Sequence, residues 1–451
     1  MAKYKAYPEY KDSGVEWVDS IPSHWEVRPT FSLCEASAKK NIDGAENNVL
    51  SLSYGNIIPR NVEENFGLLP ESFNTYQIIE RGDVILRLTD LQNDKNSLRV
   101  GLVKQKGIIT SAYLKLKAKN DMNSAFLYRL LHSYDTTKVF YGMGGGLRQS
   151  MKFEDFRRLP LLLPPKEEQL NISAFLDHET AKIDNLIEKQ QQLIELMKEK
   201  RQAVISHAVT KGLNPDVPMK DSGVEWLGEV PEHWKVSSLG YYSSLNTGAT
   251  PDRSNSKYWN GEIAWIKTGE VNYNNICSSE EKITCEAVKN TSVRLSPPGT
   301  LLMAMYGQGI TRGRVAILDI SATYNQACVA ISPNEALLNV YLRLFFMAGY
   351  HAIRDGGNET SQMNLNADIV RKFKILVPPL SEQKEIVSYL DCHLPQIEIL
   401  VERADSVIAL LQERRTALIS AAVTGKIDVR DWVMPASSEM ADIEESQGVN
   451  A

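Results

Sequence analysis

Two stretches of the chain share one spacing of apolar and polar residues. Residues 164–210 and 378–424 repeat at an offset of 214 positions without a gap. Apolar residues recur in both at intervals of three and four, which predicts a seam between two packed helices. The predicted seam residues are Ile183, Leu186, Gln190, Leu193, Met197 and Val204, and Ile397, Leu400, Ala404, Val407, Leu411 and Leu418. Two ordinary amphipathic helices in separate cores are the alternative interpretation.

A second repeat precedes each of these stretches. Residues 11–27 read KDSGVEWVDSIPSHWEV and residues 220–236 read KDSGVEWLGEVPEHWKV, an offset of 209 positions. We call these two stretches the lead segments. Their shared side chains are Trp17 and Trp226, Trp25 and Trp234, and His24 and His233. We expect the tryptophans to hold an extended segment on a domain surface. The histidines are expected to form hydrogen bonds rather than bind metal, because no second ligand accompanies either one.

Two stretches of about 130 residues lie between the repeats and do not resemble each other. The predicted strands are Asn48–Ser53, Asp83–Leu88, Val100–Val103 and Ile108–Leu116 in the first, and Ile263–Lys267, Thr300–Tyr306, Arg314–Leu318 and Ala327–Ile331 in the second. A helix is predicted in each, at Ser124–Ser133 and Asn339–Ala348. Short strands with few helices indicate an α+β fold.

Composition narrows the class of protein. A chain of 451 residues predicts two or more domains, and its 43% hydrophobic and 24% charged content is typical of soluble globular proteins. No apolar run approaches the ~18 residues that span a membrane, and the first residues do not form a secretory signal. The five cysteines form no close pair. We therefore expect no membrane, no disulfide framework, no metal site and a cytoplasmic location.

The net charge of −6 conceals an uneven distribution. Residues 431–451 carry five acidic side chains and no basic one, so we expect a disordered acidic tail. Residues 28–158 contain 19 Lys and Arg against 14 Asp and Glu, whereas residues 237–370 contain 10 against 11. This balance makes the first region mildly basic, and an isolated half should bind nucleic acid weakly at best.

The repeated residues resemble a known family. GVEW, a P-x-HW-x-V run, PP-x-x-EQ, a long helix and AVTKG or AVTGK occur twice in the same order. This arrangement resembles the specificity subunit of type I restriction-modification systems. The resemblance implies two α/β target-recognition domains separated by two long antiparallel helices, with an internal pseudo-two-fold repeat. It divides the chain into a first recognition domain (1–157), a central helix (158–211), a second recognition domain (212–371), a C-terminal helix (372–430) and the tail (431–451).

The resemblance also implies a function. Each domain would read one half of a bipartite, non-palindromic target in double-stranded DNA, and the helices would hold two methyltransferase subunits together with restriction and translocase subunits. This chain would carry no cofactor and would not be an enzyme by itself, whereas its partners would use S-adenosylmethionine, ATP and Mg. The residues lead to part of this unaided, because two dissimilar regions on a repeated frame suit two different half-sites.

Candidate DNA contacts follow from the chemistry of base edges and phosphates. Arg, Lys, Asn and Gln read base edges, and Lys, Arg, Ser and Thr bind phosphates. The candidates are Arg87, Lys95, Arg99, Tyr141, Arg148, Gln149 and Lys152, and Lys267, Thr268, Gln308, Arg312, Arg314, Asn358 and Gln362. Residues 306–314, YGQGITRGR, form the strongest candidate loop. For each residue a solvated surface charge is the competing interpretation.

Two other functions fit some of the residues. Asp252 with Glu280-x-Lys282 matches a short nuclease-like pattern, which would make the chain a cryptic Mg-dependent nuclease. A coiled-coil scaffold without DNA readout would explain the helices, but it would leave two large strand-rich regions without a role.

Overall fold

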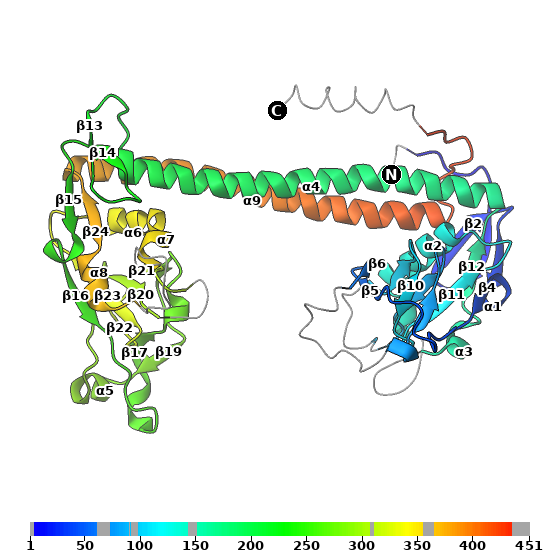
Figure 1. The fold of residues 1–451 in the computed structure, drawn as a ribbon, viewed down its shortest axis with the longest axis horizontal. Helices are drawn as coiled ribbons and strands as arrows, with labels where there is room; N and C mark the ends of the chain where they lie inside the picture. The colour runs from blue at the N-terminus through cyan, green and yellow to red at the C-terminus, as the bar shows by residue number, and fades with distance from the viewer. Residues whose placement is uncertain are drawn as a thin grey trace. The chain divides into compact units, whose positions relative to one another are not determined.

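The computed structural model describes residues 4–60, 73–89, 91, 98–142, 151–306, 311–354 and 365–434. It forms two compact units, unit 1 with residues 1–190 and 406–451 and unit 2 with residues 191–405. Two long helices, α4 (Lys166–Lys211) and α9 (Leu380–Val423), belong partly to each unit (Figure 1). No helix in the described ranges is long and apolar enough to span a bilayer.

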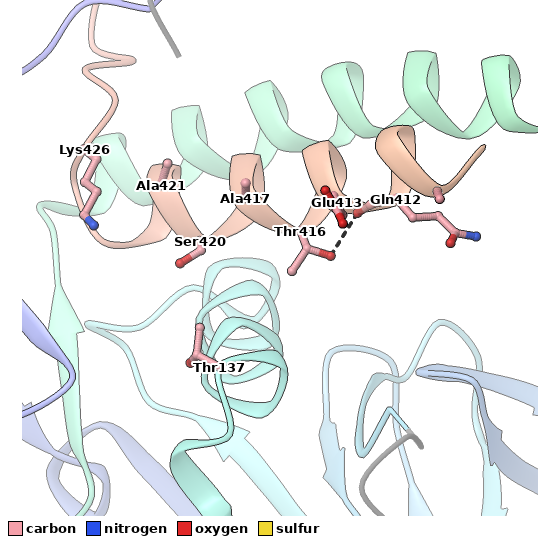
Figure 2. A pocket seen from close by; sticks show the side chains of 9 residues that line it. Thr137, Gln412, Glu413, Thr416, Ala417, Ser420, Ala421 and Lys426 are labelled. Carbon is pink, nitrogen blue, oxygen red and sulfur yellow. Dashed lines mark hydrogen bonds between the residues drawn. The ribbon is translucent and has the colours of Figure 1, made fainter. Parts of the chain in front are cut away.

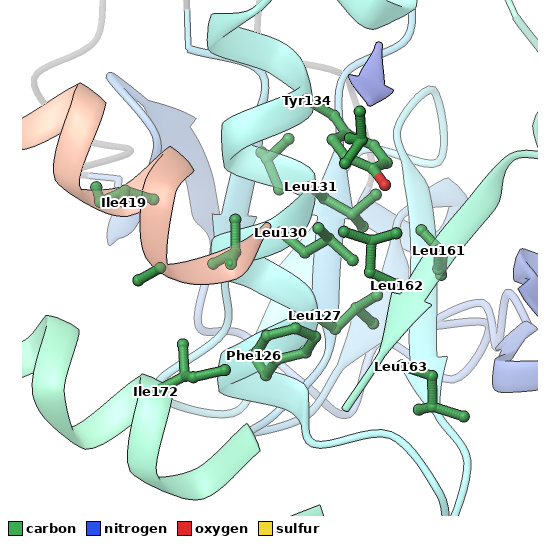
Figure 3. Close-up of a cluster of buried hydrophobic side chains, with 14 of the residues drawn as sticks. Phe126, Leu127, Leu130, Leu131, Tyr134, Leu161, Leu162, Leu163, Ile172 and Ile419 are labelled. Carbon is green, nitrogen blue, oxygen red and sulfur yellow. The ribbon is translucent and has the colours of Figure 1, made fainter. Parts of the chain in front are cut away.

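The head of unit 1 is a six-stranded sheet in the order β4-β11-β8-β9-β6-β5. Its strands are β4 (Cys34–Ala36), β5 (Leu50–Ser53), β6 (Asn56–Pro59), β8 (Val84–Leu86), β9 (Val100–Leu102) and β11 (Leu114–Ala118). Helix α2 (Ser124–Thr136) packs on this sheet and begins where the Asn123 side chain accepts from two backbone amides. Its apolar face joins side chains from both long helices in one core (Figure 3).

The remaining elements of unit 1 are short. They are β1 (Tyr10–Val15), β2 (Val18–Pro22), α1 (Thr30–Leu33), η1 (Phe73–Thr75), β7 (Gln77–Ile79), β10 (Gly107–Ile109), η2 (Val139–Gly142) and α3 (Phe153–Phe156). Strand β10 pairs with β7, and its Ile108 forms an isolated bridge with Val49 just before β5. The single strand predicted at Ile108–Leu116 is therefore wrong: the backbone turns at Thr110–Tyr113, and the run forms β10 and β11.

The head of unit 2 contains a five-stranded sheet in the order β16-β23-β20-β21-β18. Its strands are β16 (Ser243–Thr247), β18 (Asn275–Ile276), β20 (Leu301–Ala304), β21 (Val315–Leu318) and β23 (Cys328–Pro333). The same head contains a three-stranded sheet, β19-β17-β22, formed by β17 (Trp259–Ile266), β19 (Glu281–Ile283) and β22 (Ala322–Tyr324). Helix α6 (Asn339–Ala348) packs on β21 and has the bounds predicted from the sequence.

The remaining elements of unit 2 are short. They are β13 (Met219–Asp221), β14 (Glu229–Pro231), η3 (Leu239–Tyr241), η4 (Ser256–Tyr258), η5 (Thr268–Glu270), α5 (Cys285–Asn290), α7 (Tyr350–Arg354) and α8 (Ala367–Lys372). Hairpin β13–β14 is formed by the second lead segment, as β1–β2 is by the first.

The two heads share a frame although their sequences do not repeat. The order β4-β11-β8-β9-β6 in unit 1 matches β16-β23-β20-β21-β18 in unit 2, strand for strand. In both, the last pair is parallel and the other neighbours are antiparallel. The predicted α+β fold, with two α/β domains and two long helices packed together, is confirmed.

In each unit a two-stranded sheet joins the beginning and the end of the head, and we call it the base sheet. The sequence did not predict these sheets. In unit 1, β3 (Glu26–Pro29) pairs antiparallel with β12 (Pro160–Leu163). In unit 2, β15 (Lys235–Ser238) pairs in the same way with β24 (Lys374–Val377). Each lead segment therefore leads into a strand that pairs with the strand before the Pro-Pro. The rest of the head is inserted in the chain between these two paired strands.

Along the seam between α4 and α9, every second inward-facing residue lies one position later in the sequence than predicted. Ile183, Gln190, Met197 and Val204 face inward as expected, but Leu186 and Leu193 are 39% and 36% exposed. The intervening inward positions are instead taken by Ile187, Ile194 and Arg201, and on α9 the inward set is Ile397, Val401, Ala404, Ile408, Leu411, Arg415 and Leu418. Leu400 and Val407, 46% and 39% exposed, are corrected in the same way. Their intervals are four and three, so the helices meet along a seam rotated from the one predicted.

Ion pairs repeat along the seam as the residues do. In unit 1 the Asp184 carboxylate accepts from Arg415 Nε at 2.8 Å. In unit 2 Arg201 Nε lies 3.4 Å from Glu398 Oε1. Glu398 is the counterpart of Asp184, and Arg415 that of Arg201, at the 214-residue offset. The two pairs are thus one interaction made twice, as an antiparallel pair of like helices requires.

The segments that follow the two helices differ between the units. In unit 2 the continuous linker 212–218 joins α4 to β13. In unit 1 two separate segments meet: the Asp428 amide donates to Lys5 O at 2.8 Å, and the Tyr10 hydroxyl donates to Gly425 O at 3.1 Å. Gly212 and Gly425 both have positive φ just beyond their helices, where a left-handed residue ends a helix without strain.

Candidate nucleic-acid and partner interfaces

The two lead segments are fixed by a carboxylate at the start of each long helix. In unit 1 Glu168 accepts from His24 Nε2 at 2.9 Å and from Trp25 Nε1 at 3.0 Å. In unit 2 Glu382 accepts from His233 and Trp234, both at 2.8 Å. The expected hydrogen-bonding role of the histidines is therefore confirmed, and the EQ motif supplies their acceptor.

The glutamine of each EQ motif fastens the head to the same helix. Gln169 accepts from the Asn123 amide at 2.7 Å and donates to Asp121 O and Pro164 O. Gln383 makes the equivalent bonds, accepting from the Leu338 amide at 2.8 Å. Both glutamines are fully buried. The start of the helix on each sheet, α2 or α6, is thereby tied to the first turn of a long helix.

A cationic and aromatic cluster lies in unit 1 where the β8–β9 hairpin meets the end of η2. Arg99 Nε donates to the Tyr141 hydroxyl at 3.1 Å, and Lys138 Nζ lies 4.6 Å from the centre of the same ring. Arg87 extends the hairpin, its amide donating to Arg99 O at 2.9 Å. Three of the predicted contacts, Arg87, Arg99 and Tyr141, are thus brought together. Lys138 was missed because no motif distinguishes it from other surface lysines.

Arg99 is corrected as a DNA contact. Its side chain is fully buried, and its guanidinium donates to Arg87 O and Thr89 O at 3.2 and 2.8 Å. Its backbone amide donates to the buried Asp135 carboxylate at 2.6 Å. A buried guanidinium bonded to loop carbonyls positions those carbonyls rather than meeting a ligand. Arg99 is therefore a positioning residue for the hairpin.

A comparable cluster occupies the same place in unit 2. Arg314 immediately precedes β21, as Arg99 immediately precedes β9, and its guanidinium lies 5.7 Å from the Tyr273 ring and bonds to Asn272. Tyr273 packs edge-on against Tyr350, over which Arg354 lies at 5.9 Å. The last two side chains were missed, although the Gly-rich run DGGN directly after them was a usable signal.

The other predicted contacts are scattered or lie outside the described residues. Lys152 is exposed before α3, Arg312 is half-buried in the loop before β21, and Thr268 begins η5. Lys267 is held by ion pairs to Glu280 and Glu281 at 2.6 and 3.2 Å. Outside the described residues are Lys95, Arg148, Gln149, Gln308, Asn358 and Gln362, as is the tail beyond 434.

The nuclease-like pattern is engaged in local structure. Asp252 accepts from the amide and hydroxyl of Ser254 at 2.9 and 2.8 Å, which lowers the pKa of its exposed carboxyl. Glu280 is paired with Lys267. Both side chains therefore have structural roles, and among the described residues no group of three or more His, Cys, Asp or Glu is placed to hold a metal ion.

Each unit leaves an apolar surface on its helices exposed. In unit 1 it consists of Leu186, Val407 and Leu410, and in unit 2 of Leu400, Leu193 and Leu196. The two sets correspond residue by residue at the 214-residue offset. An exposed apolar surface of this kind is a candidate site for contact with another protein.

Unit 1 also has a groove beside α9. It has a volume of about 670 Å³, and small α9 residues such as Ala417 and Ser420 line it opposite Thr137 at the end of α2 (Figure 2). In unit 2 the counterpart of Thr416 is Gln202, whose amide donates to Met347 O at 3.1 Å. The longer side chain bridges the helices there, so the units differ in detail around a common frame.

Comparison with known proteins places these features in one family. A family model described as type I restriction modification DNA specificity domain matches residues 22–196 and 231–407. The chain is 30% identical over 171 residues to the MjaIX specificity subunit of Methanocaldococcus jannaschii, covering 36% of this chain and 38% of that protein. It is 25% identical to the EcoR124I/EcoR124II specificity subunit of Escherichia coli, covering 62% of this chain and 66% of that protein.

Other similarities extend over most of the chain. The putative MjaX specificity subunit of M. jannaschii is 22% identical over 92% of this chain and 96% of its own length. A chain from a structural study of complex assembly in the type I R-M system has a TM-score of 0.69 at 16% identity, covering 90% of this chain and 99% of that chain. The HsdS subunit from Thermoanaerobacter tengcongensis has a TM-score of 0.53 at 16% identity over 90% and 98%. With two matched repeats, each on one shared frame, the chain belongs to the family of type I restriction-modification DNA specificity proteins.

Proposed function

We propose that this chain is the cytoplasmic subunit that recognises DNA sequence in a type I restriction-modification complex. Each head reads one half of a bipartite, non-palindromic target, and partner subunits supply methylation, ATP-driven translocation and cleavage with S-adenosylmethionine, ATP and Mg. The observation that carries this proposal is the pair of unlike heads on one five-stranded frame, each set on an equivalent base. Two identical heads would suit a palindrome, and unlike heads suit two different half-sites.

The arginine and tyrosine clusters are the surfaces we propose for DNA. Arg87, Lys138 and Tyr141 in unit 1, and Arg312, Arg314 and Arg354 in unit 2, lie around the loop of the equivalent hairpin or the helix end beside it. Guanidinium groups read guanine edges or bind phosphates, and tyrosine offers both a ring and a hydroxyl. Lys95, Arg148, Gln149, Lys152, Lys267, Thr268, Gln308, Asn358 and Gln362 remain proposed contacts from the sequence.

We further propose that two methyltransferase subunits bind to the duplicated helix surfaces. Leu186, Val407 and Leu410 present one apolar surface, and Leu400, Leu193 and Leu196 present its copy. The heads, lead segments and helices would then form a fixed base for partners that bring the catalytic residues. Restriction and translocase subunits would join this assembly through the same methyltransferase subunits or beside them.

Exchange of one head tests the proposal. Residues 28–156 begin within β3 and end before β12, the two strands that pair with each other, so a head from another family member should fit at the same place. The assay is sequencing of methylated sites in cells that carry the complex with the natural or the exchanged head. One half of the modified sequence should change while the other stays the same. A change in both halves, or in neither, would reject the assignment of one half-site to each head.

A further inference from the structure

The carboxylate that fixes the first lead segment has a third donor. The Tyr7 hydroxyl donates to Glu168 Oε1 at 2.5 Å, in addition to the bonds from His24 and Trp25. The Tyr7 ring is 4% exposed and packs edge-on against Trp25, with centroids 6.0 Å apart. The phenol therefore fills the space between the lead segment and α4, and it leaves the Glu168 side chain only 4% exposed.

Unit 2 lacks this third donor. The backbone register is the same, because the Ser23 amide donates to Glu9 O in unit 1 and the Glu232 amide donates to Pro218 O in unit 2. At that register the counterpart of Tyr7 is Asp216, which is exposed. Glu382 accepts from His233 and Trp234 alone among the described residues, and its side chain is 33% exposed.

A cavity of about 360 Å³ lies where the tyrosine is missing. Val217, His233, Glu382, Glu385 and Ile386 are among its lining residues. Its walls thus combine aliphatic side chains, an imidazole and a carboxylate with lone pairs to spare. An imidazole and a carboxylate, His24 and Glu168, are also next to Tyr7. Glu385 takes the place of Asn171 in the first repeat, so α9 brings a carboxylate to this cavity where α4 has a neutral amide.

We propose that this cavity in unit 2 binds a tyrosine side chain presented by a partner protein, with its hydroxyl donating to Glu382. The internal template is Tyr7, which binds the equivalent carboxylate within the chain. The additional Glu385 favours a basic residue close to that tyrosine, as Lys5 is close to Tyr7. The partner segment should therefore resemble the chain's own Lys5-Ala6-Tyr7. This site concerns partner binding and does not depend on DNA recognition, so either proposal can fail without the other.

The test uses the purified full chain and a blocked peptide with the sequence of residues 4–10, YKAYPEY. Calorimetric or NMR titration should show one site on the natural chain and two on Tyr7→Ala, which opens the equivalent space in unit 1. Glu382→Gln should weaken binding at the unit 2 site by at least about tenfold, because a hydrogen bond to a charged acceptor is lost. A peptide with Phe in place of Tyr7 should lose a similar factor.

A second variant guards against misfolding of the first. Val217→Trp should fill the cavity without altering Glu382, and it should abolish the unit 2 site while far-UV circular dichroism stays unchanged. Absence of peptide binding to the natural chain at millimolar concentration would overturn the proposal. Binding that is unchanged in both Glu382→Gln and Val217→Trp would overturn it as well, because the peptide would then be bound elsewhere.

Discussion

Removal of the two equivalent carboxylates should destabilise the two units unequally. Glu168→Ala leaves Tyr7 Oη and Trp25 Nε1 buried without an acceptor, and it removes the partner of His24. A buried donor left unsatisfied costs roughly 1–3 kcal/mol, so the two donors together should cost unit 1 about 2–6 kcal/mol, while the partly exposed His24 is rehydrated. Glu382→Ala orphans only the buried Trp234 Nε1, because the half-exposed His233 is rehydrated, and should cost roughly 1–3 kcal/mol.

Hydrogen exchange followed by mass spectrometry resolves the two units separately. The amides of β3 and β12 report on unit 1, and those of β15 and β24 report on unit 2. The exposed Glu167, which precedes Glu168, is the matched control, and Glu167→Ala should leave protection within error. The reasoning would be refuted if Glu382→Ala lowered protection in unit 2 as much as Glu168→Ala lowers it in unit 1.

Three further expectations follow from the helices and from one buried histidine. Ile194→Asp should destabilise the helix pair by about 3 kcal/mol in denaturant titrations, because Ile194 is buried in the seam. Leu193→Asp should cost under about 1 kcal/mol and should instead weaken methyltransferase binding in a pull-down. Equal destabilisation by the two variants would contradict the corrected seam. Burial, with the charges of Arg415 and Arg129, lowers the pKa of His132 to about 4, so the folded state binds this proton less readily than the unfolded chain does. The contribution of this group to stability is complete above pH 6.5 and is lost as the pH falls towards 4. His132→Gln should therefore reduce the loss of stability at low pH by up to about 3 kcal/mol in pH-dependent unfolding. Four residues inserted after both Glu188 and Glu402 should lengthen each helix by ~6 Å. The unread gap of the DNA target should then grow by about one or two base pairs, while the half-site sequences stay the same. A folded variant whose methylated sites keep only the original gap would show that the helices do not set the spacing.

Repetition made most of the frame predictable from the sequence. Two copies of one pattern established the long helices, and the lengths of apolar runs located β8, β20 and α6 close to their observed bounds. The seam was misplaced because Leu186 and Leu193 fit a heptad as well as Ile187 and Ile194 do. Apolar character alone cannot separate a helix contact from a partner surface when both follow the same spacing.

The sites were harder to predict than the frame because they depend on contacts between distant residues. Arg99 and Arg87 look alike in sequence, yet one is enclosed by loop carbonyls and the other extends the hairpin. The base sheets pair strands that are more than 130 residues apart, and each strand alone is too short to give a pattern. The acceptor role of Glu168 likewise requires a lead segment that lies 143 residues away.

The closure of unit 1 by two separate segments suggests how such a chain arises. In unit 2 the linker 212–218 connects the end of a long helix covalently to a lead segment. In unit 1 hydrogen bonds of Lys5 and Tyr10 with residues 425–428 make the equivalent connection. Traced along its backbone, the chain is a circuit of two like halves with one break. Cutting the linker would create a second break of the same kind and leave two half-length chains held by the α4–α9 seam. The present chain therefore has the connectivity of a homodimer whose two subunits have been fused once. After such a fusion, divergence of the heads alone would be enough for the complex to recognise a target without symmetry.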